Sequence, residues 1–130
     1  MGAPPFVERL ECLRCGRAFK RGLDGPCPRC GPEGVLEIVF DVRAARRSLN
    51  RRALKARARD VWRYRELLPV AAKGATPPLP VGWTPVTSAP RLGAWAGVRT
   101  LLVKDEGRNP TASFKDRASV VGVTRALAAR

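Results

Sequence analysis

Lys115 and its neighbours could support covalent chemistry. The lysine follows an apolar, β-branched run at 98–104 and precedes an Ala/Val-rich run, so it falls where a predicted buried strand gives way to a predicted helix. Ser113 and Asp116 have the spacing of a capping box, which makes Ser113 the N-cap and places Lys115 in the first helical turn. Free N–H groups there and Arg117 favour a neutral, nucleophilic amine, whereas three nearby carboxylates oppose it. The residues alone leave open whether this is a reactive lysine or an ordinary solvated one.

Four cysteines form a second pattern with clear chemistry. They make two Cys-x-x-Cys-Gly knuckles separated by eleven residues, with the thiols at Cys12, Cys15, Cys27 and Cys30. Two intervening residues allow one tight turn to present both sulfurs to one ion, and this spacing is typical of four-thiolate zinc sites. Two disulfides or four free thiols are the alternatives. Disulfides are disfavoured in a cytoplasmic chain, and unrelated free thiols do not account for four cysteines that all fall into the two pairs. Since four protein ligands fill a tetrahedral site, we expect Zn²⁺ to be structural.

The elements around the cysteines predict a zinc ribbon at 1–40. Residues 6–12 alternate like a short edge strand, and 35–40 are rich in β-forming residues and predict the closing strand. We expect removal of the metal to unfold residues 6–40.

A basic connector is predicted over 41–75. Asp41 is placed to cap a helix over 42–59, and Asp60 to cap a second helix over 61–68 that ends before a proline. Trp62, Tyr64, Leu67 and Leu68 would make the second helix a docking element. An irregular connection is predicted over 70–82, and the boundary to a third unit, 76–130, falls within it.

The charge is strongly positive. The net charge is +14 and the pI about 11.3, with twenty arginines against five lysines. Such a balance indicates nucleic acid or another polyanion, but it also fits compositional bias. Because the run 42–59 has no aromatic residues for base stacking, we favour a solvated linker helix and expect no nucleic-acid partner. With no signal sequence and no apolar run of membrane-spanning length, the chain is predicted to be cytoplasmic, with no membrane partner.

The lysine segment resembles a known enzyme family. Residues 104–117 (KDEGRNPTASFKDR) are similar to the cofactor-lysine segment of pyridoxal-phosphate enzymes of the tryptophan-synthase-β type. Phe114 directly before the lysine and residues 62–69 (WRYRELLP) resemble threonine synthases, and relatives that make cysteine or cystathionine usually lack the aromatic residue. Residues 82–86 (GWTPV) resemble the segment that introduces the catalytic fold. Threonine synthases often carry an N-terminal zinc ribbon as well.

The resemblance implies a fold, a cofactor and a reaction. The fold is α/β: the zinc ribbon is followed by the first part of a three-layer catalytic domain. Lys115 is then the catalytic residue and binds pyridoxal 5'-phosphate as a Schiff base, with Ser113 and Asn109 as further cofactor-binding residues. Asp116 and Arg117 would position the helix, and Thr111 with Asn109 would face the pocket. The implied reaction converts O-phosphohomoserine and water to threonine and phosphate, in threonine biosynthesis.

The length predicts an incomplete enzyme. The chain of 130 residues is too short for both lobes and has no glycine-rich loop to cradle the cofactor phosphate. We therefore expect a truncated N-terminal fragment that is inactive alone, and oligomerisation of full-length members stays open. The alternatives are a basic zinc-ribbon module that binds nucleic acid and another pyridoxal-phosphate lyase or synthase of this type. Ala112 replaces a glycine found in many members, which is tolerable if its φ is negative.

Overall fold

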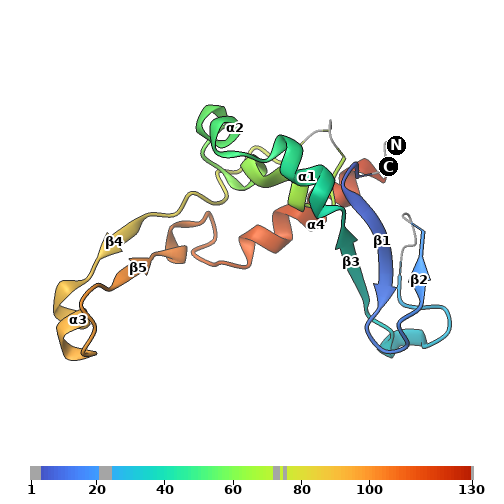
Figure 1. Cartoon of the computed structure of the whole chain (residues 1–130), viewed down its shortest axis with the longest axis horizontal. Coiled ribbons are helices and arrows are strands. Elements are labelled where there is room, and N and C mark those ends of the chain that lie inside the picture. Colours follow the sequence, from blue (N-terminus) through green and yellow to red (C-terminus); the bar gives the residue numbers. More distant parts are fainter. Residues whose placement is uncertain (1–3, 21–24, 72–73, 75, 130) are drawn as a thin grey trace.

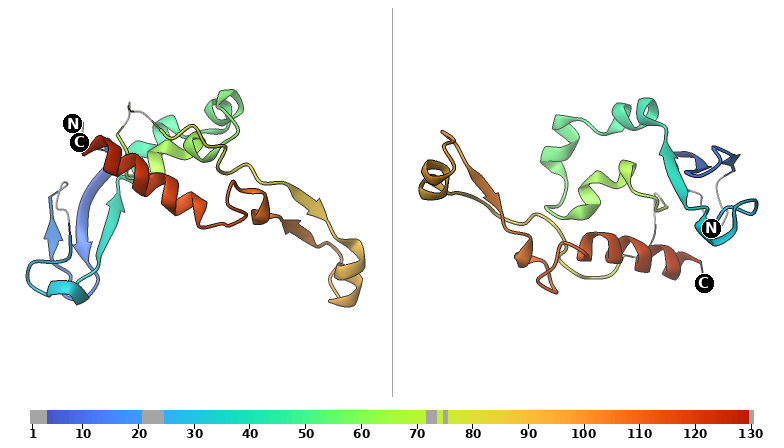
Figure 2. Two further views of the ribbon diagram at one scale, coloured as in Figure 1. Left: turned by 180° about the vertical axis from the view of Figure 1, so that it is seen from behind. Right: turned by 90° about the horizontal axis from the view of Figure 1, so that it is seen from below.

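The computed structural model describes residues 4–20, 25–71, 74 and 76–129 of this mixed α/β chain. Figure 1 shows an elongated molecule with a three-stranded sheet at one end, helices in the middle and a two-stranded arm at the other end. The two further views in Figure 2 show the same separation. None of the described helices is long and apolar enough to cross a membrane.

The three-stranded sheet contains β1 (Val7–Cys12), β2 (Ala18–Phe19) and β3 (Leu36–Phe40) in the antiparallel order β2-β1-β3. The predicted strands at both ends of the cysteine segment are confirmed. The prediction that the first is an edge strand is wrong, because β2, which follows the first knuckle, pairs with its free side. A register shift between Val7 and Arg9 interrupts the alternation, so that Val7, Leu10 and Cys12 are all buried.

The predicted helix over 42–59 is two helices, α1 (Val42–Ser48) and α2 (Arg51–Ala56). Asp41 caps α1 as predicted, since its carboxylate accepts a hydrogen bond of 2.8 Å from the N–H of Ala44. The prediction of one continuous helix is wrong because Asn50 is extended and its side chain caps α2, accepting from the N–H of Ala53 at 3.0 Å. An asparagine that satisfies a new helix start competes with continuation of the previous helix.

The second predicted helix is the 3₁₀ segment η2 (Val61–Leu67), which Asp60 caps through the N–H of Trp62 at 2.9 Å. It docks in the middle of the molecule: Val61 packs with Val81 and Val120, and Trp62 and Leu68 cover this core. This packing is what a docking element requires of these two residues. Tyr64 and Leu67 of the same predicted set remain 44% and 43% exposed.

The arm consists of β4 (Val86–Ser88), α3 (Pro90–Trp95) and β5 (Leu102–Lys104). The strands pair antiparallel, with Thr87 opposite Val103. The prediction of a buried strand over 98–104 is wrong: the strand has three residues, and Leu102 and Val103 are 59% and 42% exposed. Among the described residues β5 has β4 as its one strand partner, and every residue of both strands is exposed.

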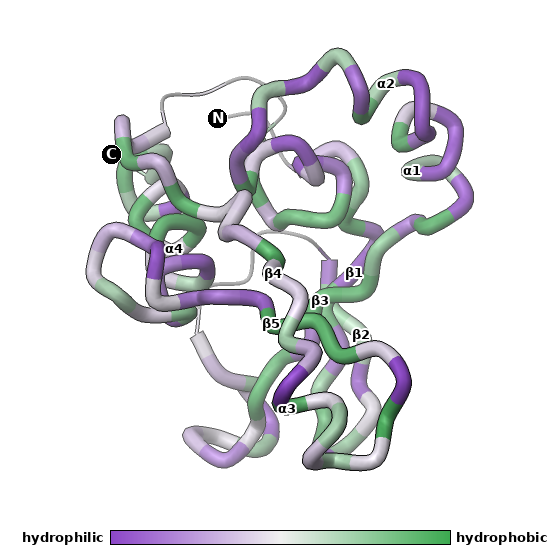
Figure 3. Tube along the Cα trace, turned by 90° about the vertical axis from the view of Figure 1, so that its left-hand side faces the viewer, coloured by the Kyte–Doolittle hydropathy of each residue, from purple (hydrophilic) through white to green (hydrophobic). Residues whose placement is uncertain are grey.

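The chain then turns through η3 (Glu106–Arg108) and enters the longest helix, α4 (Asp116–Ala128). Val120 of α4 lies in the core with η2, so the start of α4 is held beside the middle of the molecule. In Figure 3, α4 shows both hydrophobic and hydrophilic segments along its length.

Candidate functional site

Lys115 is exposed and lies immediately before α4. Its carbonyl accepts hydrogen bonds from the N–H groups of Ala118 at 3.1 Å and Ser119 at 3.0 Å, so the lysine itself occupies the N-cap position. The predicted position of the lysine between a strand and a helix is thus confirmed. A loop separates β5 from Lys115, and α4 follows the lysine directly. Among the described residues, its side chain forms no ion pair.

The predicted capping box is wrong. Ser113 does bind the backbone, because its Oγ accepts from the N–H of Lys115 at 3.2 Å, but it lies two residues before the N-cap. The carboxylate of Asp116 does not return to Ser113. It accepts from the N–H of Thr111 at 2.8 Å and from the Thr111 hydroxyl at 2.5 Å. Asp116 is buried. Its two hydrogen bonds to Thr111 close a loop that contains residues 112–115.

Ala112 lies at the apex of this loop and has a φ of +56°. The condition under which alanine replaces glycine without cost, a negative φ, is therefore not met. Left-handed backbone costs an L-residue roughly 1–2 kcal/mol because Cβ approaches the following carbonyl oxygen. The loop before Lys115 consequently carries local strain, which the bonds of Asp116 to Thr111 hold in place.

Glu106 is the centre of a polar cluster that the sequence did not reveal. Its carboxylate accepts from Arg117 Nε at 2.7 Å and Nη2 at 2.8 Å, and from the buried hydroxyl of Thr84 at 2.6 Å. Lys104 donates to the Thr84 carbonyl at 3.0 Å. Residues 106 and 117 have no helical or strand spacing that would predict their contact. The only signal of it in the sequence is that two opposite charges occur in one short segment.

The cluster changes the electrostatics around the lysine. Hydrogen bonds from Arg117 and then from Thr84 lower the pKa of Glu106 to about 2, although partial burial opposes this. The carboxylate is therefore ionised at neutral pH and compensates the charge of Arg117. The charge of Arg117, two residues after Lys115, is thus paired within the cluster.

Asn109 joins this cluster to the preceding chain. Its side chain is 4% exposed, its Oδ1 accepts from the N–H of Gly82 at 3.0 Å, and its Nδ2 donates to the Glu106 carbonyl at 2.9 Å and carboxylate at 3.1 Å. Gly82 has φ +92°, and a Cβ there would lie 2.9 Å from the backbone N of Val61. A side chain at position 82 would thus push η2 away from the loop that carries Lys115.

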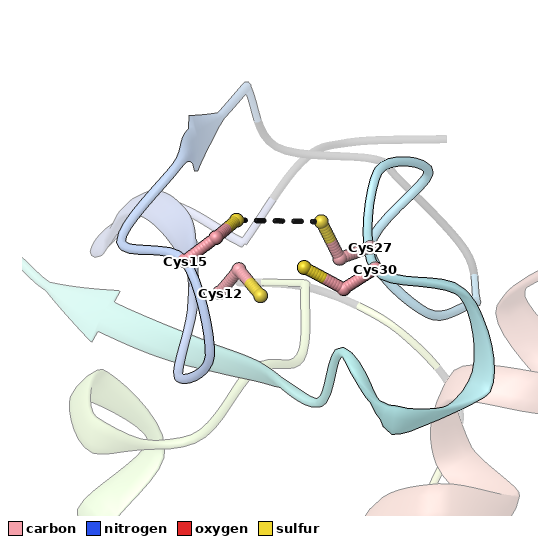
Figure 4. Close-up of side chains that lie close together, drawn as sticks. All are labelled: Cys12, Cys15, Cys27 and Cys30. Atoms are coloured by element: carbon pink, nitrogen blue, oxygen red, sulfur yellow. Dashed lines mark hydrogen bonds between the residues drawn. The ribbon is translucent and has the colours of Figure 1, made fainter.

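The four cysteines come together as predicted. One ligand atom from each of Cys12, Cys15, Cys27 and Cys30 lies within 4.8 Å of every other. Figure 4 shows the four sulfurs facing one another from two turns, and the Sγ atoms of Cys15 and Cys27 are 3.8 Å apart. Each knuckle turns through a glycine of positive φ, Gly16 at +67° and Gly31 at +64°.

The thiol cluster fits a tetrahedral zinc ion. With Zn–S bonds of about 2.3 Å, the sulfurs of such a site are about 3.8 Å apart. Burial alone would raise the pKa of Cys12, but N–H groups of Cys15 and Arg14 outweigh it and lower the pKa to about 7. The pKa of Cys30 is raised to about 12, first by its hydrogen bond with Cys15 and then by burial. Unequal protonation is expected of clustered thiols, and a cation among them would favour the thiolate form of all four.

The two candidate sites lie apart. The cysteines lie where the three-stranded sheet meets its turns, whereas α4 begins near the base of the arm (Figures 1 and 2). The thiol cluster therefore has no direct place in chemistry at Lys115.

The lysine segment lies within a region that is similar to known proteins. Residues 78–130 match the family described as pyridoxal-phosphate dependent enzyme. The chain is 38% identical over 122 residues to a threonine synthase of Methanosarcina acetivorans, covering 93% of this chain and 29% of the relative. It is 39% identical over 116 residues to a threonine synthase of Methanocaldococcus jannaschii, covering 89% of this chain and 28% of the relative.

A threonine synthase of Mycobacterium leprae is 48% identical over 65 residues, which cover 50% of this chain and 18% of the relative. The comparison with solved structures found no significant match. The chain spans less than a third of the length of the two archaeal relatives. The chain is thus similar to threonine synthases over most of its length, and its residues 78–130 match the family of pyridoxal-phosphate dependent enzymes.

Proposed function

We propose that this chain carries the cofactor lysine of a threonine-synthase-like enzyme, which converts O-phosphohomoserine and water to threonine and phosphate. The observation that carries the proposal is the placement of Lys115. Its amine is exposed, it immediately precedes α4, and the loop before it is closed by Asp116. This arrangement leaves one amine accessible to an aldehyde while its backbone is fixed.

The chain's own residues would hold and orient this amine. Glu106 and Arg117 tie the turn after β5 to the first turn of α4, and Asn109 ties the same turn to Gly82. The Ser113 hydroxyl accepts a hydrogen bond from the backbone N–H of Lys115 within the same loop. Pyridoxal phosphate, when bound, supplies the electron sink for the reaction. Lys115 would hold or move a proton at its Nζ.

The assigned roles of Asn109 and Ser113 at the cofactor need refinement. Both polar atoms of the Asn109 side chain are engaged by Gly82 and Glu106, so we propose that Asn109 acts by fixing the loop. The Ser113 hydroxyl accepts one hydrogen bond and keeps its own proton for donation. Ser113 is therefore the better candidate for a direct contact with the cofactor.

We further propose that the four cysteines bind a structural zinc ion. The 3.8 Å separation of the Cys15 and Cys27 sulfurs and the convergence of all four thiols support it. With four thiolate ligands such a site has no open position for water, so it would stabilise the sheet and take no part in the reaction.

The chain alone is proposed to be inactive, because it supplies the lysine but no glycine-rich loop for the cofactor phosphate. Incubation with pyridoxal phosphate and O-phosphohomoserine should yield no steady production of threonine. Continuous release of phosphate and threonine by the purified chain would contradict this part of the proposal.

Attachment of the cofactor can be tested without turnover. The chain is incubated with substoichiometric pyridoxal phosphate, reduced with borohydride and mapped by peptide mass spectrometry. We expect the reduced cofactor mainly on Lys115, with several-fold less on Lys55, another exposed lysine, which lies in α2. Equal labelling of the two lysines would contradict a specific role for Lys115. The Lys115→Arg variant controls for the assignment of the labelled peptide.

A further inference from the structure

The outer faces of α1 and α2 carry a dense set of cations. Six of them are exposed, and none forms an ion pair or a side-chain hydrogen bond among the residues that the structure describes: Arg43, Arg46, Arg47, Arg51, Arg52 and Lys55. We call these six residues the cationic face. No acidic residue occurs between positions 42 and 59 to compensate them.

The cationic face is unfavourable for the isolated helices. Arg43 lies three and four residues before Arg46 and Arg47, and Arg51 lies four residues before Lys55, so like charges face each other along the helix surface. Each such pair destabilises a helix by a few tenths of a kcal/mol. A bound polyanion would remove this repulsion.

The opposite side of the helices is already occupied. Ala45 of α1 is buried, and α1 contacts η2. Leu49 and Leu54 are partly buried as well. In Figure 3 the tube over α1 and α2 is mainly purple, with green interruptions at the apolar positions. The six cations therefore remain available to a partner.

The sequence alone favoured a solvated linker helix without a nucleic-acid partner. From the unpaired cations on one side of α1 and α2 we propose instead that the cationic face binds the phosphate backbone of nucleic acid, without reading its sequence. Five of the six cations are arginines, whose planar forks match phosphate oxygens better than a lysine ammonium does. A membrane surface fits less well, because an interfacial helix needs bulky apolar residues beside its cations, and the leucines here face the protein. The absence of aromatics argues against base stacking and leaves backbone contacts as the mode of binding.

The test compares two variants of equal net charge. One replaces three cations of the face, Arg46→Gln, Arg47→Gln and Arg51→Gln. The control replaces three exposed arginines elsewhere, Arg17→Gln, Arg91→Gln and Arg99→Gln. Glutamine is nearly as good a helix former as arginine, so the helices should persist, and circular dichroism checks this. Binding of a fluorescent 20-base-pair DNA duplex is measured by anisotropy from low to moderate salt.

We expect the wild-type affinity to fall steeply with salt. The variant of the face should lose more than about tenfold in affinity, and its slope of log K against log salt should be shallower by about 0.9 for each arginine that contacted a phosphate. The control should keep the wild-type slope. Scrambling the duplex sequence should change little.

Several outcomes would overturn the proposal. Equal losses in both triple variants would show that net charge alone attracts DNA. Wild-type binding without a salt dependence would exclude phosphate contacts. If polyglutamate displaced the labelled duplex as effectively as unlabelled duplex of the same total charge, the face would be assigned to an acidic protein. Tighter binding to anionic phospholipid vesicles than to the duplex would assign it to a membrane surface.

Discussion

The carboxylate of Glu106 accepts two hydrogen bonds from the guanidinium of Arg117, at 2.7 and 2.8 Å. This pair joins the turn after β5 to the first turn of α4, on either side of the loop that presents Lys115. The same carboxylate also holds the hydroxyl of Thr84, so three segments of the chain meet at one side chain.

Replacing Glu106 with glutamine should loosen this junction. Glutamine keeps the size of the side chain but loses the charge and one acceptor, so Arg117 and Thr84 lose partners together. We expect a lower urea midpoint and faster amide exchange over 109–117, measured by hydrogen–deuterium exchange. Asp105→Asn is the matched control, because Asp105 pairs with the exposed Arg108. Equal effects of the two variants would show that Glu106 has no special place in the loop.

Replacing Ala112 with glycine should stabilise the chain. The φ of +56° strains alanine but not glycine. Part of the gain is offset by the greater freedom of glycine in the unfolded chain, which leaves about 0.5–1 kcal/mol. Denaturant unfolding measures the change. Ala118→Gly, in the regular helix α4, should destabilise by up to about 1 kcal/mol, and loss of stability in both variants would refute the strained loop.

Removing zinc should unfold the three-stranded sheet. A chelator is expected to free four thiols, measured with a thiol reagent, and to reduce the β signal in circular dichroism. Cys15→Ser should bind zinc much more weakly, whereas Leu13→Ser, at an exposed position in the same knuckle, should bind normally. Because zinc displaces protons from the thiols, its affinity should fall as pH falls. A chain that keeps its sheet and spectrum after complete chelation would contradict a structural zinc site.

Glu66 should make folding sensitive to acid. Its side chain is 6% exposed and pairs with Arg57, which also donates to the Arg63 carbonyl. Hydrogen bonding from Arg57, against an opposing effect of burial, lowers the pKa of Glu66 from 4.5 to about 2. Because the folded pKa is depressed, the stabilisation is present above pH 4.5 and is lost as pH falls toward 2.

Glu66→Gln should therefore cost about 3 kcal/mol at neutral pH and much less at pH 2, as measured by denaturant unfolding. Glu33→Gln is the matched control. Glu33 pairs with Arg14 and is largely exposed, and such exposed pairs contribute under about 1 kcal/mol to the free energy of unfolding. A Glu66 variant that remains as stable as the wild type at neutral pH would contradict the importance of this pair.

The sequence determined the features that depend on residue type and short spacing. The cysteine knuckles, the caps Asp41 and Asp60 and the junction position of Lys115 are all local, because a turn or a helix start involves residues within a few positions of one another. The resemblance of residues 104–117 to cofactor-lysine segments agrees with the family match over 78–130.

The tertiary structure decided what depends on distant partners. Pairing with β2 made β1 the central strand, and the absence of a covering layer among the described residues left β5 exposed. The Glu106–Arg117 pair and the positive φ of Ala112 arise where the path of the chain from β5 to α4 is fixed by packing of α4 on η2. Such contacts join residues with no regular spacing, so no periodicity in the sequence encodes them.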